Sequence, residues 1–409
     1  MVHPSKRIIV NDGPLSGKSV VLGVTASISL YKSLDLAREL MRHGSEVHVI
    51  MSRAASRLIS PSMFEWATGN PVIVDITGNL EHVQLSEKEA MVVAPATMNF
   101  LNKLVYGITD NSVLLTASNF IGEHKPLFIV PTMHLSMYKT TQVLHSLEML
   151  KSQGIHIIEP YEERDVAHYP DINLLTWQIE SIILRGKDLS GKKILVTAGP
   201  TREYMDPVRF MSNPSSGTMG IAIANEAFFR GADVRLIHGP LSTSMKPAMK
   251  NVFEVKTTDE MMKEVEAGVK EGFSIVILAG APADFSFQNK FENKVDTARE
   301  VPEVKLIKTP KVSSVAVGKA FVVGFSAETV DNDEELTKKA RAKMERHGFN
   351  MIVTNNVSRH DIGFGSTDNE IFIITNESQM KISKNNKIVI ARGILDNVKK
   401  ELELQRRRV

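Results

Sequence analysis

A chain of 409 residues is too long for one ordinary hydrophobic core, so its length predicts two domains. The hydrophobic fraction of 43% is typical of globular proteins, and the formal net charge of +2 gives no bias toward nucleic acid. The absence of cysteine excludes disulfides, thiolate metal sites and a cysteine nucleophile. No apolar stretch approaches the roughly 20 residues of a membrane helix, and the first residues lack the pattern of a signal peptide, so we expect a cytoplasmic protein without a membrane partner.

Short apolar runs alternate with segments of helical period, which predicts an α/β protein with two doubly wound, Rossmann-like domains and mainly parallel sheets. A polar, glycine-containing stretch at 184–193 separates the two series and places the domain boundary near Lys187. The expected domains are 1–187 and 188–409. Predicted strands lie at 19–25, 46–52, 90–96 and 126–132, then at 192–199, 233–239, 273–280, 321–327, 350–356 and 370–376, with a first helix at 29–44.

A phosphate site is predicted where the first strand gives way to a helix, at 23–32. Thr25, Ala26 and Ser27 would bring backbone N–H groups and two hydroxyls to the positive end of that helix. Because G-x-G-x-x-G is missing, a mononucleotide such as FMN fits better than a dinucleotide. An ordinary N-capped helix is the alternative. The stretch at 13–19 is not a Walker loop, because it lacks the first glycine and precedes its strand.

The second domain has an unusual insertion, which ends in FMSNPSSGTMG at 210–220. About twenty residues stand where nucleotide-binding domains place a short glycine turn after their first strand. Ser215, Ser216 and Gly217 can hold a phosphate with backbone N–H groups at the start of the next helix. Asn213 can donate an uncharged hydrogen bond to a carbonyl or oxyanion. The insertion therefore predicts an anion site.

Three stretches of the first half resemble, in order and spacing, the flavin-dependent cysteine decarboxylases: GVTASISLYK, EHVQLSEKEAMVVAPATMNFLNKLVYGITDN and PTMHLSMY. In the second half, TAGPTREYMDPVRFMSNPSSGTMG is similar to the phosphopantothenate–cysteine ligases. The chain is thus identified as a member of the bifunctional phosphopantothenoylcysteine decarboxylase/phosphopantothenate–cysteine ligase family of coenzyme A biosynthesis. The resemblance implies a flavodoxin-like, FMN-binding decarboxylase domain followed by a CTP-dependent ligase domain.

For the ligase domain, the resemblance implies that 4'-phosphopantothenate is activated as an acyl-cytidylate, which the amine of cysteine then attacks. Asn213 and Lys294 are the expected catalytic residues, although NKVD replaces the denser basic KIKK of most relatives at Lys294. Asp284 is expected at the ribose or base, and Phe325 against the cytosine. The implied nucleotide site comprises Ser215, Ser216, Gly217, Ala279, Gly280, Asp284, Lys294, Pro310, Lys311, Phe325, Lys339 and Lys343.

For the decarboxylase domain, the resemblance implies that His82 acts beside the flavin, where oxidation of the cysteine side chain to a thioaldehyde precedes loss of carbon dioxide. His134 stands where most relatives bind the substrate carboxylate with asparagine, and a histidine can donate the same bond. The segment 158–173 lacks the lid cysteine of relatives, which leaves His168 or Tyr169 as the candidate proton donor. The implied flavin site comprises Thr25, Ala26, Ser27, Ser52, Ala94, Thr97 and Asn111.

Several of these residues have simpler explanations when the resemblance is set aside. Asn213 precedes a proline and would be a turn residue. Lys339 and Lys343, four residues apart on a helix, can reach one polyphosphate, but lysines at that spacing are typical of solvated faces. His82 would be a partly buried, hydrogen-bonded histidine.

Three functions remain open at this stage. The first is a working bifunctional enzyme with an altered lid. The second is an active ligase fused to an FMN-binding domain with weak or no decarboxylase activity, and the third is a nicotinamide oxidoreductase, which the missing glycine fingerprint disfavours. The resemblance implies FMN, and CTP with Mg²⁺ held mostly by phosphates and water. It also implies homo-oligomers, with trimeric flavin domains and dimeric ligase domains.

Overall fold

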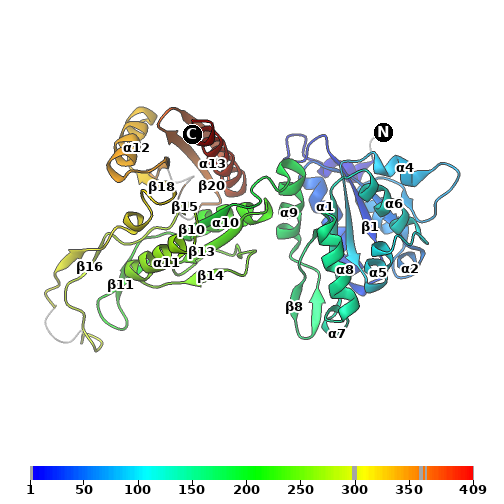
Figure 1. Cartoon of the computed structure of the whole chain (residues 1–409), viewed down its shortest axis with the longest axis horizontal. Coiled ribbons are helices and arrows are strands. Elements are labelled where there is room, and N and C mark those ends of the chain that lie inside the picture. The colour runs from blue at the N-terminus through cyan, green and yellow to red at the C-terminus, as the bar shows by residue number, and fades with distance from the viewer. Residues whose placement is uncertain (1–2, 297–301, 359–362, 364–365, 409) are drawn as a thin grey trace. The chain divides into compact units, whose positions relative to one another are not determined.

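The computed structural model describes residues 3–296, 302–358, 363 and 366–408. The chain forms two compact units, Met1–Gly186 and Lys187–Val409, and each is an α/β unit built on a mainly parallel sheet (Figure 1). The fold class is therefore the predicted one. In the part of the chain that the structure describes, every helix is too short or too polar to cross a bilayer.

The first unit contains a six-stranded parallel sheet in the order β3-β2-β1-β4-β5-β7. Its central strands are buried on both faces, which explains their continuous apolar sequences. β1 pairs with β2 from Ser19 opposite Glu46 and with β4 from Val20 opposite Ala90. The strands are β1 (Ser19–Val24), β2 (Glu46–Met51), β3 (Val72–Ile73), β4 (Ala90–Ala96), β5 (Leu127–Pro131) and β7 (His156–Ile157).

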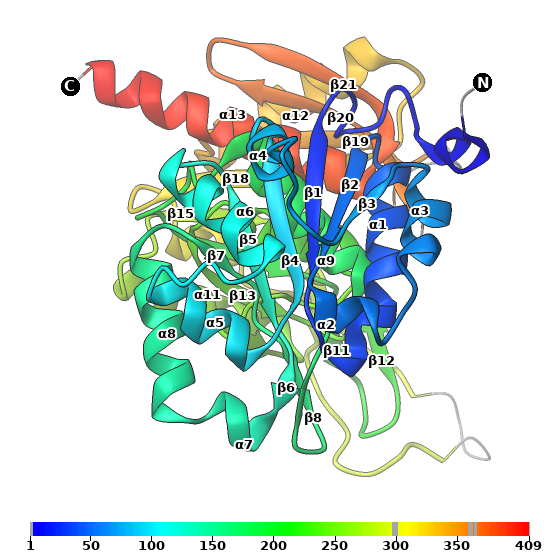
Figure 2. The same ribbon diagram turned by 90° about the vertical axis from the view of Figure 1, so that its right-hand side faces the viewer.

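Helices cover both faces of this sheet and form two separate cores (Figure 2). On one face, Leu36 and Leu40 pack with Phe64 and Ile179 against the sheet, as the helical period predicts. That face carries α1 (Lys32–Arg42), α3 (Pro61–Thr68) and α9 (Ile172–Arg185). The opposite face carries α4 (Glu81–Ser86), α5 (Met98–Val105), α6 (Ser112–Gly122) and α8 (Thr141–Ser152).

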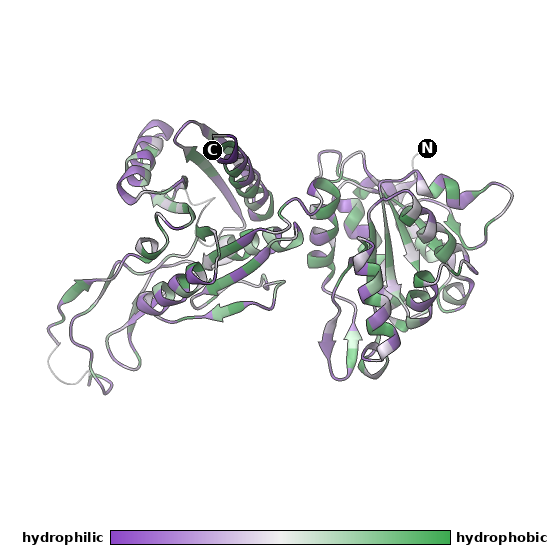
Figure 3. Cartoon of the chain, viewed as in Figure 1, coloured by the Kyte–Doolittle hydropathy of each residue, from purple (hydrophilic) through white to green (hydrophobic). Residues whose placement is uncertain are grey.

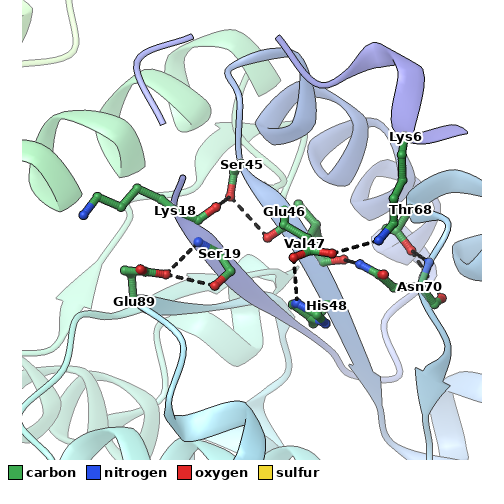
Figure 4. Close-up of polar contacts among 10 residues, drawn as sticks. All are labelled: Lys6, Lys18, Ser19, Ser45, Glu46, Val47, His48, Thr68, Asn70 and Glu89. Carbon is green, nitrogen blue, oxygen red and sulfur yellow. Dashed lines mark hydrogen bonds and ion pairs between the residues drawn. The ribbon is translucent and has the colours of Figure 1, made fainter. Parts of the chain in front are cut away.

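Polar contacts fill the amino edge of the same sheet (Figure 4). The Lys6 ammonium lies 2.8 Å from the Glu46 carboxylate and ties η1 (Pro4–Ile8) to β2; the hydrogen bond from Lys6 lowers the pKa of Glu46. The Glu89 carboxylate accepts bonds from the backbone N–H and the hydroxyl of Ser19, at 2.6 and 2.9 Å. The Asn70 amide donates to the Val47 carbonyl at 2.8 Å. These polar groups therefore stabilise the fold of the first unit through contacts within the protein.

The second unit contains an eight-stranded sheet in the order β14-β13-β10-β15-β18-β19-β20-β21, in which the last two strands run antiparallel. β21 is an exposed edge strand, and its lysines Lys381 and Lys384 discourage pairing with another chain. The strands are β10 (Lys193–Ala198), β13 (Asp233–His238), β14 (Val252–Glu254), β15 (Ile275–Leu278), β18 (Phe321–Glu328), β19 (Met351–Asn356), β20 (Asp368–Thr375) and β21 (Gln379–Asn386).

The helices of the second unit differ in how much of their surface is buried, because they contact different numbers of neighbouring elements. α10 (Thr218–Phe229) is apolar nearly all round because it packs against β10 and also against α13 (Lys387–Arg408). α11 (Thr258–Lys270) and α12 (Asp333–His347) each bury one apolar stripe, in two further cores. The outer surface of α12 is accordingly hydrophilic (Figure 3).

Two hairpins lie side by side and extend from the second sheet (Figure 1). The predicted insertion forms one of them, from β11 (Arg202–Tyr204) and β12 (Phe210–Ser212). The other pairs β16 (Phe285–Phe287) with β17 (Leu306–Lys308). The long loop predicted from the sequence thus contains a pair of short strands. A five-residue segment, 213–217, connects the second strand to α10.

A buried ionic cluster fastens α13 and the start of the unit to α10. The Arg230 guanidinium, 0% exposed, donates to both carboxylate oxygens of Asp188 at 2.8 Å and lies 2.9 Å from Asp396. Lys399 adds a further contact of 3.0 Å to Asp188. Burial alone would raise the pKa of Asp188, but hydrogen bonds from Arg230 and Lys399 lower it. The carboxylate therefore stays charged near neutral pH.

Replacing the buried arginine should loosen this cluster. We expect Arg230→Ala to lower the free energy of unfolding of the second unit by about 3 kcal/mol, because it removes the completely buried guanidinium that joins Asp188 to Asp396. Urea unfolding, read by hydrogen exchange of peptides from α10, measures this change. Lys263→Ala, which removes an exposed pair with Asp259, is the control and should leave the transition in place. Equal behaviour of the two variants would contradict the role of the cluster.

Candidate functional sites at the carboxyl edges of the sheets

A cavity of about 410 Å³ opens at the carboxyl edge of the second sheet, where ligands of parallel α/β sheets bind. It is lined by the loops after β12, β15 and β19, the carboxyl end of β18 and the start of α10. The structure brings together ten of the predicted ligase residues there: Asn213, Ser215, Ser216, Gly217, Ala279, Gly280, Asp284, Lys311, Phe325 and Lys343.

The amino end of α10 forms one wall of this cavity. Gly217 caps the helix with a φ of +84°, and a side chain at this position would collide with Leu241. The Ser216 hydroxyl lies 2.8 Å from that of Thr218, so the hydroxyls are held beside the first turn. The first N–H groups of a helix lack partners inside it, and together with the helix dipole they favour an anion here.

Asn213 connects the insertion to the loop after β15. Its amide nitrogen donates to the carbonyl oxygens of Ala281 and Pro282, at 3.2 and 3.1 Å. The sequence predicted that this amide donates to a reacting carbonyl, but in the structure protein acceptors take both of its N–H groups. Asn213 must exchange one of these bonds to reach a ligand.

Three cations of the predicted nucleotide site differ in their placement. Lys343 lines the cavity and donates to the Ser326 hydroxyl at 3.1 Å, while Lys311 pairs with Asp284 at 2.6 Å. Lys339 lies about 6 Å along the helix axis from Lys343, outside the cavity lining, and pairs with Glu335 at 2.7 Å. Lys339 and Lys343 therefore have different surroundings in the structure, and the expectation that both reach one polyphosphate stays a prediction.

Lys294 and Pro310 also lie outside the cavity lining. Lys294 is exposed on the segment between β16 and β17, and Pro310 directly precedes the lining residue Lys311. The expectation that these two residues belong to the nucleotide site stays a prediction.

The cavity also contains polar residues that the sequence analysis missed. The Lys387 ammonium is buried at the start of α13 and donates to the carbonyls of Gly363 and Ser366, at 3.2 and 2.6 Å. Burial lowers the pKa of Lys387. Asn355 and Asn369 lie beside it and bond to each other at 3.3 Å. Of these residues, Asn355 could have been predicted, because it ends a strand at the carboxyl edge.

The first unit has a corresponding cavity of about 580 Å³ at the carboxyl edge of its sheet. Five of the seven predicted flavin residues line it: Thr25, Ala26, Ser52, Thr97 and Asn111. Arg53 and Lys103 add positive charge to the lining, although each pairs with an aspartate. Small polar side chains and cations of this kind suit a phosphate-bearing ligand.

Most of these polar residues hold helix starts in place. Ser52, Thr97 and Asn111 each accept a bond from a backbone N–H in the first turn of the following helix. The Thr25 hydroxyl donates to the Pro95 carbonyl at 2.8 Å and accepts from the Thr97 N–H at 3.2 Å. The bond between Thr25 and Thr97 joins the loops that follow β1 and β4.

Two predicted flavin residues do not line the cavity. Ala94 is completely buried within β4, and the hydroxyl of Ser27 bonds to those of Ser29 and Thr132 at 3.1 and 3.2 Å. The predicted helix at 29–44 begins later than expected, because a 3₁₀ turn, η2 (Ile28–Tyr31), separates Ser27 from α1.

The two histidines predicted for the flavin site lie outside the lining of this cavity, and their place beside the flavin stays a prediction. His82 is half-buried on α4 and His134 is exposed on β6 (Met133–His134); neither is part of the cavity lining. The ring of Tyr169, the other candidate proton donor, lies in the hydrophobic core, where burial raises the pKa of its hydroxyl. His168 is half-buried on β9 (Val166–His168), opposite Tyr161 of the neighbouring strand β8 (Tyr161–Glu163).

Each of the two α/β units has a polar cavity beside helix starts at the carboxyl edge of its sheet, which is where ligands of parallel α/β sheets bind. Among the described residues, no group of three or more histidine, aspartate or glutamate side chains could hold a metal. The protein therefore belongs to the class of two-domain α/β proteins in which each domain has its own candidate site.

Comparisons with known proteins identify the family. The family model described as "Flavoprotein" matches residues 9–184, and "DNA/pantothenate metabolism flavoprotein C-terminal domain" matches residues 189–402. The coenzyme A biosynthesis bifunctional protein CoaBC of Thermococcus kodakarensis is 38% identical and covers 98% of this chain and 100% of its own length. Its Escherichia coli K12 counterpart is 32% identical over 96% of this chain and 100% of its own. The chain belongs to this family of bifunctional enzymes.

A solved crystal structure of the C-terminal domain of a coenzyme A biosynthesis bifunctional protein CoaBC is also similar. It is 30% identical, covers 53% of this chain and 98% of its own, and has a TM-score of 0.43.

His347, which lines the second cavity and stacks on Phe349, provides a test for anion binding. Burial, together with the charges of Lys311, Lys343 and Arg346, lowers the pKa of His347. A bound polyphosphate favours the charged imidazole, so it should raise this pKa. Deuterium exchange at the imidazole carbon, followed by mass spectrometry with and without inorganic triphosphate, measures the shift. His145, outside the cavity, is the control; an unchanged His347 would argue against anion binding here.

Proposed function

We propose that the chain ligates 4'-phosphopantothenate to cysteine with CTP, through an acyl-cytidylate, and then decarboxylates 4'-phosphopantothenoylcysteine to 4'-phosphopantetheine with FMN, in the cytoplasm. Family membership supports the pair of reactions. The observation that carries the ligase assignment is the convergence, in one cavity, of the α10 amino end, Asn213 and the cations Lys311 and Lys343. Two phosphate-bearing molecules must meet in this reaction, and such a cavity offers several anion sites.

In the ligation step, the backbone N–H groups of Ser215, Ser216 and Gly217 hold one phosphate at the start of α10. Lys343 reaches the nucleotide phosphates, and Mg²⁺ enters with the nucleotide, held by its phosphates and water. When the Asp284 carboxylate turns to the ribose, it breaks its ion pair with Lys311. The Lys311 ammonium can then bind the phosphates. Each group thus exchanges a protein partner for a ligand.

Asn213 acts on the activated carboxylate. When substrate enters, one N–H of its amide leaves the Ala281 or Pro282 carbonyl and donates to the oxygen of the mixed anhydride. An amide suits this place because it is uncharged and does not compete as a nucleophile. The bond retained with the loop keeps the donor oriented.

In the first unit, Thr25, Ala26 and Thr97 would hold the phosphate of FMN, and the joined loops after β1 and β4 fit that group. FMN, when bound, supplies the oxidising centre for the cysteine side chain. His82 holds or moves the proton at that side chain, and His134 donates to the substrate carboxylate.

A second copy of the chain completes the flavin site in this proposal. His82 and His134 lie outside the cavity of their own chain, while Ile28 and Tyr106 expose large apolar side chains, 79% and 72% exposed. We propose trimeric flavin units and dimeric ligase units, which places the histidines of one copy beside the cavity of another.

One assay tests both reactions. The purified chain is supplied with 4'-phosphopantothenate, cysteine and CTP or ATP, and pyrophosphate and carbon dioxide are followed together. Pyrophosphate without carbon dioxide would favour the second candidate, a ligase fused to a weak decarboxylase; the burial of Tyr169 and the absence of cysteine support that candidate. Release of neither product would contradict the proposal.

Asn213→Asp should impair ligation selectively. The change removes the donor and places a negative charge beside the phosphates, so we expect the rate of pyrophosphate release to fall by roughly 10² or more. Decarboxylation of supplied 4'-phosphopantothenoylcysteine should continue. Asn385→Asp on the exposed strand β21 is the matched control and should ligate normally. Normal ligation by Asn213→Asp would show that the assigned mechanism is wrong.

His82→Asn should abolish carbon dioxide release while FMN stays bound, because Thr25, Ala26 and Thr97 hold the phosphate elsewhere. Flavin absorbance of the purified variant and carbon dioxide release measure the two effects. The control is His124→Asn, since His124 is exposed at a φ of +55°, a conformation that asparagine tolerates. Decarboxylation by the His82 variant at the rate of the control would remove His82 from the reaction.

A further inference from the structure

A buried aspartate organises the turn between β11 and β12. Asp206 is 2% exposed, and its carboxylate accepts bonds from the backbone N–H groups of Val208 and Arg209, at 2.8 and 2.7 Å. The Arg209 guanidinium donates to the same carboxylate at 2.6 Å. These contacts already account for the conformation of the turn.

The same two side chains also bind a segment far away in the sequence. The N–H of Val295 donates to the Asp206 carboxylate at 3.1 Å, and the Arg209 guanidinium donates to the Val295 carbonyl at 3.1 Å. Both backbone groups of Val295 are therefore held by one ion pair. Nearby, the N–H of Phe291 donates to the Met205 carbonyl at 2.8 Å.

Lys294 directly precedes Val295 and is exposed, so apolar packing does not fix its position. Burial alone would raise the pKa of Asp206, but the hydrogen bonds from Arg209, Val208 and Val295 hold it well below the ordinary value. The ion pair therefore persists across the physiological pH range. The buried Asp206 carboxylate thus also binds the exposed segment at Val295. The turn between β11 and β12 does not require these additional contacts.

We propose that Asp206 and Arg209 are positioning residues of the ligase, and that they hold the backbone at Val295 so that Lys294 is presented to the acyl phosphate. This inference rests on the proposed function, in which Lys294 takes part in ligation. The chemical class of the ligand is an acyl phosphate ester, a mixed anhydride whose negative charge the presented ammonium stabilises. Misplacement of such a group by about 1 Å can lower a rate roughly 10²-fold.

A double-mutant cycle separates positioning from general stability. We expect Asp206→Asn to lower kcat for ligation about 10-fold to 100-fold, with a smaller change in the KM for CTP. In a Lys294→Ala background the same change should lower kcat less than about 2-fold, because no ammonium remains to be positioned. Asp259→Asn, which breaks an exposed pair on α11, is the matched control and should have no effect in either background.

Trypsin cleavage gives a second measurement that does not depend on activity. Cleavage after Lys294 in the full chain should be slow in the native protein and at least about 10-fold faster in Asp206→Asn, relative to cleavage after Lys384 on the exposed strand β21. If Asp206→Asn does not fold, Arg209→Lys replaces it, since it keeps the charge but loses the double contact to Asp206 and Val295.

The possible failures are distinguishable. Equal losses of kcat in both backgrounds would overturn the positioning role, as would normal ligation by Asp206→Asn. Full activity of Lys294→Ala would contradict the role of Lys294 in the proposed function, and the cleavage measurement would then decide alone whether the ion pair holds the segment. Unchanged cleavage after Lys294 would overturn the inference.

Discussion

When helices cover both faces of a parallel sheet, polar groups can gather only at the amino and carboxyl ends of its strands. This constraint holds for both units of the protein. At the carboxyl edge, loops from several strands meet the amino ends of helices, so unpaired N–H groups and positive dipole ends gather there. Both cavities lie at such edges. At the amino edge of the first sheet, by contrast, Lys6, Glu46 and Glu89 are paired within the protein.

The polar residues of the two cavities share a second property, which is that protein partners already hold them. Asn213 donates to two carbonyls, Lys311 pairs with Asp284, and Thr97 caps a helix. Such contacts orient a side chain before a ligand arrives, so less conformational entropy is lost on binding.

The insertion in the second unit shows how a long loop can be ordered without a large core. Its two short strands lie beside a second hairpin, and the turn between them is built around Asp206. Hydrogen bonds to a buried carboxylate therefore replace apolar packing in this part of the molecule. The insertion ends at Ser215–Gly217, and so its conformation also sets where α10 begins.

The two series of strands and the mainly parallel sheets could be predicted from the sequence, because apolar period is a local signal. Serine and glycine at a helix start are local signals too, and the anion site that they indicate at Ser215–Gly217 stays a prediction. Only the tertiary structure decided which of the matched residues share a cavity. Lys343 faces it while Lys339 is held by Glu335, Tyr169 lies in a core, and Lys387 comes from the far end of the chain. Side-chain direction and ion pairing depend on neighbours that are distant in sequence, and no local pattern encodes them.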